Sequence, residues 1–171
     1  LLGGLARPSA GEVWLDSQPI FKLGDDALSS LRNRRLGFVF QYHHLLNDLS
    51  AVDNVALPLR VSGVSRKDAR QRARTLLQSM GLGHRLEHKP GELSGGEQQR
   101  VAVARASVLD PAVILADEPT GNLDKAKSDA VFDLLKAATR KGRQAVVMVT
   151  HNADLAERTD RVVRMEDGAI L

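Results

Sequence analysis

Three short apolar runs, separated by segments of helical character, constrain the fold of this chain more than any other feature. The runs are Leu36–Phe40, Ala112–Ala116 and Ala145–Val149. Each is apolar along its whole length, so apolar and polar positions do not alternate. Such runs are typical of a parallel sheet whose two faces are covered by helices. We therefore expect an α/β fold in which all three strands are buried.

Helical periodicity and capping signals fill the intervals between these strands. The predicted helices are Ala27–Arg35, Ser65–Met80, Ser94–Val108, Ala126–Thr139 and Ala153–Arg158. A further strand is expected at Glu12–Leu15, and a hairpin is expected around Glu166–Gly168. Leu1–Leu5 is interpreted as the end of a helix that two glycines terminate.

The region between about Tyr42 and Asp110 lacks strand signals and contains the two strongest helices. We therefore expect one domain with two parts: an α/β core lobe of residues 1–41 and 111–171, and an inserted helical subdomain of residues 42–110.

Composition excludes several classes of protein. The chain has 171 residues, of which 43% are hydrophobic, as in ordinary soluble proteins. It has no cysteine, which excludes disulfides, thiolate metal sites and a thiol nucleophile. No apolar run is long enough to cross a bilayer. The net charge of +3 is too small to indicate nucleic-acid binding.

Two adjacent carboxylates, Asp117 and Glu118, follow the second apolar run. Ligands of open parallel sheets bind at the carboxyl ends of the strands. There, Asp117 could hold a Mg²⁺ ion, which takes oxygen ligands and shares them with phosphates. Glu118 could orient and deprotonate a water molecule. The alternative is a solvated acidic pair.

Leu93–Arg100 contains a helix start with Ser94 as the N-cap and Glu97 three residues later, which together form a capping box. Gly95 and Gly96 let a ligand approach the backbone, and the free amides with the helix dipole favour an anion. On local physics alone, a well-capped helix explains the same residues.

Three further features are weak individually. His151 follows the third run and could donate to a phosphate oxygen. Gln41 follows the first run and could contact a metal-bound water. The segment Gly121–Asp124 is typical of a turn that begins a helix.

Taken together, these features resemble the ATP-binding domain of ABC transporters over essentially the whole chain. Gln41 resembles the family's Q-loop, Leu93–Glu97 its signature motif and Val113–Asp117 its Walker B strand. Glu118 then matches the catalytic carboxylate, Gly121–Asp124 the D-loop and His151 the switch histidine.

The resemblance implies a P-loop NTPase (RecA-like) core and an ATPase that works as a sandwich dimer. Asp117 and Gln41 would hold Mg²⁺, and Glu118 and His151 would act in hydrolysis. The resemblance also implies which residues bind ATP, some of them contacting the nucleotide that the partner subunit holds. They are Gln41, Ser94, Gly95, Gly96, Glu97 and Asp124. The chemistry is positioning and charge neutralisation.

One family motif, the phosphate loop G-x-x-x-x-G-K-[ST], is missing, because no Gly-Lys pair occurs in the chain. Leu1–Leu2 resembles the residues that follow that loop. We therefore expect a chain truncated at its N-terminus, before or within the phosphate loop, and inactive alone. The alternative is a protein that resembles the family but cannot hold its own nucleotide; the intact downstream motifs favour truncation.

Within the family, Leu1–Leu5 and Leu36–Leu46 resemble the group that releases lipoproteins from the bacterial inner membrane. The cell-division (FtsE) and efflux (MacB) groups are alternatives. The resemblance implies transmembrane permease partners and a peripheral location on the cytoplasmic face, with no nucleic-acid partner. The permease would dock near Tyr42–Leu59, whose apolar residues could instead be core: Val52, Val55, Leu57 and Leu59.

Three rival interpretations remain. His84, Glu87 and His88 match the inverted zinc-protease pattern H-x-x-E-H, although no third ligand is evident. A basic cluster could contact nucleic acid, but it lacks interleaved aromatic residues and is better explained as a solvated helix face; its members are Arg66, Lys67, Arg70, Arg72 and Arg74. A non-hydrolysing regulatory domain is disfavoured by the intact Glu118 and His151.

Overall fold

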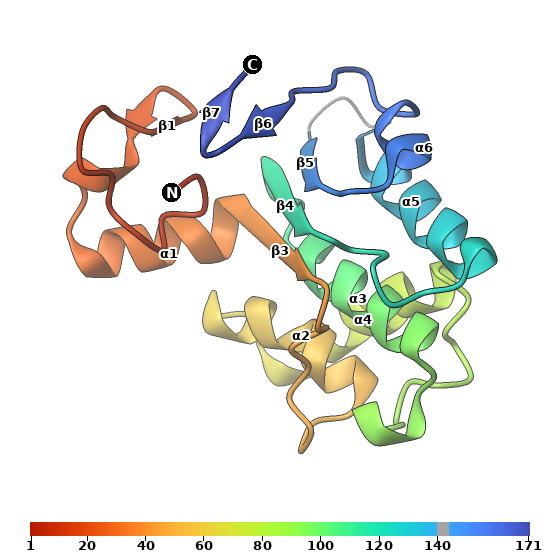
Figure 1. Ribbon diagram of the computed structural model, residues 1–171. Coiled ribbons are helices and arrows are strands. Elements are labelled where there is room, and N and C mark those ends of the chain that lie inside the picture. Colours follow the sequence, from red (N-terminus) through yellow and green to blue (C-terminus); the bar gives the residue numbers. More distant parts are fainter. Residues whose placement is uncertain (140–143) are drawn as a thin grey trace.

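A three-stranded parallel sheet lies at the centre of the computed structural model, which describes residues 1–139 and 144–171 (Figure 1). Its strands lie in the order β3 (Leu36–Phe40), β4 (Val113–Asp117) and β5 (Ala145–Val149). Parallel strands need long crossovers, which here contain helices. The predicted α/β fold with a parallel sheet is confirmed.

Helices and short strands surround the sheet, and five of the six α-helices in the described residues match their predicted positions within two residues. The helices are α1 (Asp25–Arg35), α2 (Ala51–Val61), α3 (Arg66–Ser79), α4 (Gly95–Ser107), α5 (Lys125–Thr139) and α6 (Ala153–Ala156), with 3₁₀ turns at Ile20–Lys22 and Pro90–Glu92. Two small hairpins pair β1 (Trp14–Leu15) with β2 (Gln18–Pro19) and β6 (Met165–Glu166) with β7 (Ala169–Ile170). No helix of the described residues is long and apolar enough to cross a bilayer.

The strand register brings the carboxyl ends of all three strands together. Phe40 pairs with Asp117, and Asp117 pairs with Val149. The residues that come next, Gln41, Glu118 and Thr150, therefore leave the sheet at the same edge.

Helix α4 belongs to two clusters of buried side chains. Its Val101 and Ala104 pack with α2 and α3 in a helical cluster. Its Val103 and Ala106 pack with β3, β4 and α5 in a second cluster under the sheet. Gly37 lets β3 approach this closely, since a Cβ there would collide with the Ala106 carbonyl oxygen. Helix α4 thus joins the sheet to the helical region.

Helix α2 was not predicted, because Pro58 lies inside it and is a helix breaker in sequence patterns. Burial compensates: Val52, Val55 and Leu59 are fully buried. These three residues are therefore core residues, which settles one of the open alternatives, while Leu57 is only half-buried.

The predicted burial of β5 is wrong. Val147 is 43% exposed and Val149 is 59% exposed, whereas Val146 and Met148 pack on the second cluster. Helices cover one face of β5 only, so the expectation of two covered faces fails there for the described residues.

The N-terminal prediction is also wrong. Leu1–Leu5 is a turn rather than a helix end, closed by a hydrogen bond from the Gly4 amide to the Leu1 carbonyl (2.9 Å). Gly4 has a φ of +66°, which glycine adopts without strain.

Candidate functional site

Glu118 sits in a strained turn at the end of β4. Its φ is +42°, in the left-handed region that costs a non-glycine residue about 1–3 kcal/mol. Its amide donates to the Val149 carbonyl (2.9 Å), so the chain follows β5 for one more residue before it turns at Pro119. Strain of this kind is common where a side chain must be aimed at a ligand.

The Glu118 carboxylate is held by His151 at one oxygen only. Oε1 accepts from the backbone amide of His151 (2.9 Å) and from its Nδ1 (2.8 Å). Oε2 is buried and has no hydrogen-bond partner among the described residues. The His151 side chain is 79% exposed, and since Nδ1 faces the carboxylate, Nε2 remains to meet a ligand. A fixed carboxylate with one unpaired oxygen can accept a proton from water.

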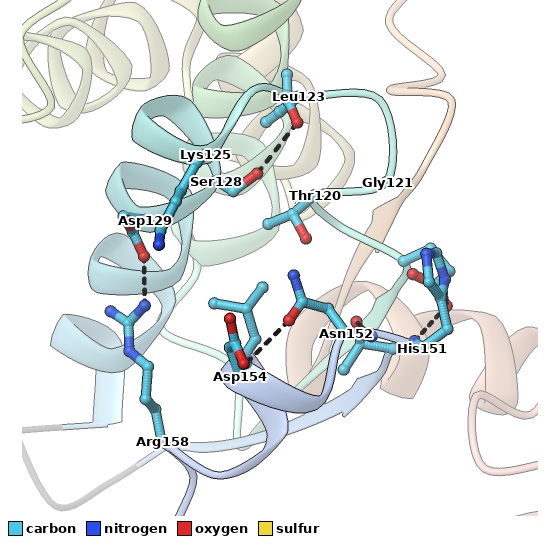
Figure 2. A pocket seen from close by; sticks show the side chains of 13 residues that line it. Thr120, Gly121, Leu123, Lys125, Ser128, Asp129, His151, Asn152, Asp154 and Arg158 are labelled. Carbon is cyan, nitrogen blue, oxygen red and sulfur yellow. Dashed lines mark hydrogen bonds and ion pairs between the residues drawn. The ribbon is translucent and has the colours of Figure 1, made fainter.

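A cavity of about 620 Å³ lies beside this pair (Figure 2). Three segments bound it: the turn after β4, the first turns of α5, and helix α6. Arg158 crosses one side, stacks on Phe132 at 4.2 Å and pairs with Asp129 and Asp133. The lining includes Glu118, Gly121 and His151, but not Asp117, Gln41 or Ser94.

Gln41 reaches the segment Gly121–Asp124. Its Nε2 lies 3.5 Å from Asn122 Oδ1, and a Cβ on Gly121 would lie 2.8 Å from the same nitrogen. A side chain at this position would therefore force the Gln41 amide to move. Asp117 is exposed at the end of the neighbouring strand. The Asp117 carboxylate and the Gln41 amide oxygen are hard oxygen donors of the type that Mg²⁺ prefers.

Asp124 caps α5. Its Oδ1 accepts from the Lys127 amide (2.9 Å), and its Oδ2 pairs with Lys127 Nζ (2.5 Å). These hydrogen bonds from Lys127 lower the pKa of Asp124. The Lys127 stem also covers Gly96 of α4, where a Cβ would lie 2.9 Å from Lys127 Cδ. The segment after β4 and the start of α4 thus pack together.

The predicted capping box at the start of α4 is present. Ser94 Oγ accepts from the Glu97 amide (3.4 Å), and Glu97 Oε2 accepts from the Ser94 amide (2.8 Å). Arg85 Nε donates to Glu97 Oε1 (2.9 Å). The bond from the Ser94 amide, followed by the bond from Arg85, lowers the pKa of Glu97 to about 2. Ser94 and Gly95 are exposed, so this helix start is open to a ligand.

Sequence reasoning missed three residues of this region: Arg85, Lys127 and Arg158. Lys127 carried a signal, because it lies three residues after Asp124 at the start of a predicted helix. Arg85 carried none, since it lies in a loop 12 residues before Glu97.

The zinc interpretation fails. Glu87 accepts from Arg70 at 2.8 and 2.9 Å, and His88 Nε2 faces Arg85 Nη1 at 3.1 Å. No group of three or more His, Asp or Glu side chains able to hold a metal occurs within residues 1–139 and 144–171. A magnesium ion held by one carboxylate and by phosphate oxygens needs no such group. Arg70 also pairs with Asp53, so part of the basic cluster serves the helical region.

Comparison with known proteins gives consistent results. Residues 1–121 match the family model described as ABC transporter. The chain is 54% identical to the lipoprotein-releasing system ATP-binding protein LolD of Geobacter metallireducens over 171 residues, which is 100% of this chain and 76% of that protein. It is 49% identical to LolD of Pseudomonas syringae pv. tomato, over 100% of this chain and 75% of that protein.

Solved structures agree with these relatives. The chain resembles the ATP-binding cassette MJ0796 in a dimeric post-hydrolysis state bound to ADP and phosphate, with a TM-score of 0.88 and 39% identity. The match covers 98% of this chain and 74% of that one. A second dimeric structure of MJ0796 matches with a TM-score of 0.87.

Proposed function

The chain belongs to the ABC transporter family of ATPases, and on that premise we propose that it is the ATP-hydrolysing subunit of a transporter that releases lipoproteins from the bacterial inner membrane toward the outer membrane. Its relatives named for the lipoprotein-releasing system support this group over the cell-division and efflux groups.

The observation that carries the hydrolytic part of this proposal is the shared sheet edge of Gln41, Glu118 and His151. There, Glu118 Oε2 accepts the proton of the attacking water while His151 fixes the other carboxylate oxygen. When both ring nitrogens of His151 carry a proton, Nε2 donates to the γ-phosphate while Nδ1 donates to Glu118. Asp117 and Gln41 are the residues that would hold Mg²⁺, which supplies neutralisation of the phosphate charge when it is bound.

The second half of the site comes from another copy of the chain. Gly95 offers an exposed amide at the positive end of the α4 helix dipole, which suits a γ-phosphate, and Ser94 offers its exposed side chain. The Ser94 amide is bonded to Glu97 and Gly96 is buried beneath Lys127, so these two amides are not open in the free chain. Ser94 and Gly95 are exposed, as contact with a partner's nucleotide requires. Lys127 pairs with Asp124 and covers Gly96. Through this contact, Asp124 couples the two sites of the dimer. The dimeric MJ0796 structures support this arrangement.

The helical subdomain of residues 42–110 serves as the link to transmembrane permease subunits. Tyr42 is 70% exposed and Leu46 is 49% exposed, directly after Gln41. These side chains are suited to contact a permease helix, which would place the protein at the cytoplasmic face of the inner membrane.

The test requires a phosphate loop. We use the chain joined at its N-terminus to the G-x-x-x-x-G-K-[ST] segment of a relative, called the completed cassette below. We expect it to hydrolyse Mg-ATP and, with a lipoprotein-releasing permease in proteoliposomes, to release an acylated lipoprotein when ATP is added. Stimulation only by a cell-division or efflux permease would contradict the lipoprotein assignment, and absence of hydrolysis would contradict the ATPase site.

A further inference from the structure

The loop after Gln41 (residues 41–50, the Gln41 loop) has a specific and strained conformation. His44 has a φ of +47°, in the left-handed region that few non-glycine residues adopt, although histidine does so more often than most. Its ring packs edge-on against the Phe40 ring, with the centroids 5.0 Å apart. A loop held in this conformation needs contacts that keep it there.

Arg105, in the last turn of α4, supplies such contacts. Its Nη1 donates to the His44 carbonyl (2.6 Å), and its Nη2 donates to the His43 carbonyl (2.9 Å). The side chain is half-buried, and burial lowers the pKa of its guanidinium. Among the described residues, no carboxylate pairs with Arg105. Its charge is therefore met by the two carbonyls of the Gln41 loop.

Two further contacts join α4 to the same segment. Gln99 is 1% exposed, and its Nε2 donates to the Phe40 carbonyl (3.4 Å). The His43 side chain lies near the backbone of Gly95, and burial lowers its pKa. Helix α4 thus contacts residues 40–44 from its first turn to its last.

We propose that Arg105 is a positioning residue that transmits the position of the signature helix to Gln41. The inference rests on the proposed function, in which the start of α4 binds the partner's γ-phosphate and Gln41 approaches the metal site. Helix α4 packs in both clusters, and as one continuous helix it is stiff between Ser94 and Arg105. A displacement at Ser94 therefore reaches Arg105, whose two hydrogen bonds to the His43 and His44 carbonyls move the Gln41 loop with it.

The geometry of the guanidinium is essential to this role. Two parallel N–H donors on a planar group fix both carbonyls at once, whereas the ammonium of a lysine acts as a single point. Arg105→Lys should therefore keep the charge but hold the loop less tightly than the parent residue does. Arg105→Ala should release the loop.

The test measures loop order and kinetics in the completed cassette. Hydrogen exchange of the amides of residues 42–46 should be at least about tenfold faster in Arg105→Ala than in the parent, and intermediate in Arg105→Lys. The kcat for ATP should fall about tenfold in Arg105→Ala while KM changes less than about twofold, since binding groups stay intact. Arg72→Ala, at an exposed position on α3, is the control and should match the parent in both measurements.

Unchanged hydrogen exchange at residues 42–46 in Arg105→Ala would overturn the proposal. So would a fall in kcat accompanied by faster exchange throughout the protein, because the loss would then reflect general destabilisation. If Arg105→Ala does not fold, Arg105→Lys decides the question by the same two readouts. If the parent cassette hydrolyses no ATP, the proposed function fails, but the exchange measurement still tests the link between Arg105 and the loop.

Discussion

His151 donates from Nδ1 to Glu118 Oε1 across 2.8 Å, and the two residues are 33 positions apart in the chain. The parallel register of β4 and β5, in which Asp117 pairs with Val149, brings them together. Within residues 1–139 and 144–171, Glu118 Oε2 has no hydrogen-bond partner, and Nε2 of His151 points away from the bond that its Nδ1 makes. A water and a phosphate oxygen are the ligands that these two groups suit.

Replacement of Glu118 by glutamine should abolish steady-state ATP hydrolysis in the completed cassette by at least about 100-fold, because an amide cannot accept the proton of the attacking water. ATP-driven dimerisation should persist, since the amide keeps the size and the hydrogen-bonding ability of the side chain. Phosphate release and light scattering measure the two properties. Glu166→Gln, in the exposed β6–β7 hairpin, is the charge-matched control, and turnover retained by Glu118→Gln would remove Glu118 from this role.

The role of Ser94 can be separated from its capping contribution, because Ser65 caps α3 in the same way. Ser94→Ala and Ser65→Ala should each lower the free energy of unfolding by about 1 kcal/mol, measured by urea denaturation. Only changes at Ser94 should affect hydrolysis, and Ser94→Arg should eliminate it by placing bulk where the partner's phosphate approaches. Loss of hydrolysis in Ser65→Ala as well would mean that capping alone explains the effect.

Gly121→Ala should lower ATP hydrolysis, because the new methyl group would displace the Gln41 side chain from its position 2.8 Å away. We expect a loss of about tenfold, with the largest effect at low Mg²⁺ concentration. Gly91→Ala is the matched control, since nothing lies within 4 Å of a Cβ at that position. Equal activity of the two variants would show that Gln41 does not depend on this contact.

The Glu97 carboxylate should make stability depend on pH in acid. Its pKa is lowered from 4.5 to about 2 in the folded chain, so the folded state binds this proton less readily than the unfolded state does. The resulting stabilisation is fully present above about pH 4.5 and is lost as the pH falls through about 2.

Urea denaturation between pH 5 and 2 tests this expectation, with Glu97→Gln as the variant that lacks the titrating group; the pH range spans the two pKa values of about 4.5 and 2. The stability difference between parent and variant should shrink toward low pH. A difference that stays constant over this range would contradict the lowered pKa.

Much of the fold could be predicted because its signals are local. The apolar runs of β3, β4 and β5 stand at their predicted positions. Ser65 and Ser94 begin helices, as their capping oxygens imply. The candidate site followed from the same signals, because Asp117 ends β4, Glu118 follows it, and His151 lies two residues after β5.

The remaining features depend on tertiary contacts that no local pattern encodes. Helix α2 was not predicted because it contains Pro58, but the burial of its apolar face stabilises it. The exposure of Val149 depends on which face of β5 the helices cover. Arg105 donates to the carbonyl of His43, which lies 62 positions away in the sequence, and no local sequence pattern predicts this contact.

The central claim is that each ATP lies between Glu118 of one copy and Ser94 of another. Mixing two inactive completed cassettes, Glu118→Gln and Ser94→Arg, tests it most directly by steady-state phosphate release. In a mixed dimer, one site combines both changes and the other combines the intact Glu118 with the intact Ser94. With equal amounts and random pairing, half of the dimers carry one intact site of two, so the mixture should recover up to about a quarter of the parent turnover, and less to the extent that the two sites are coupled. A mixture as inactive as its two components, although mixed dimers form, would contradict the shared site.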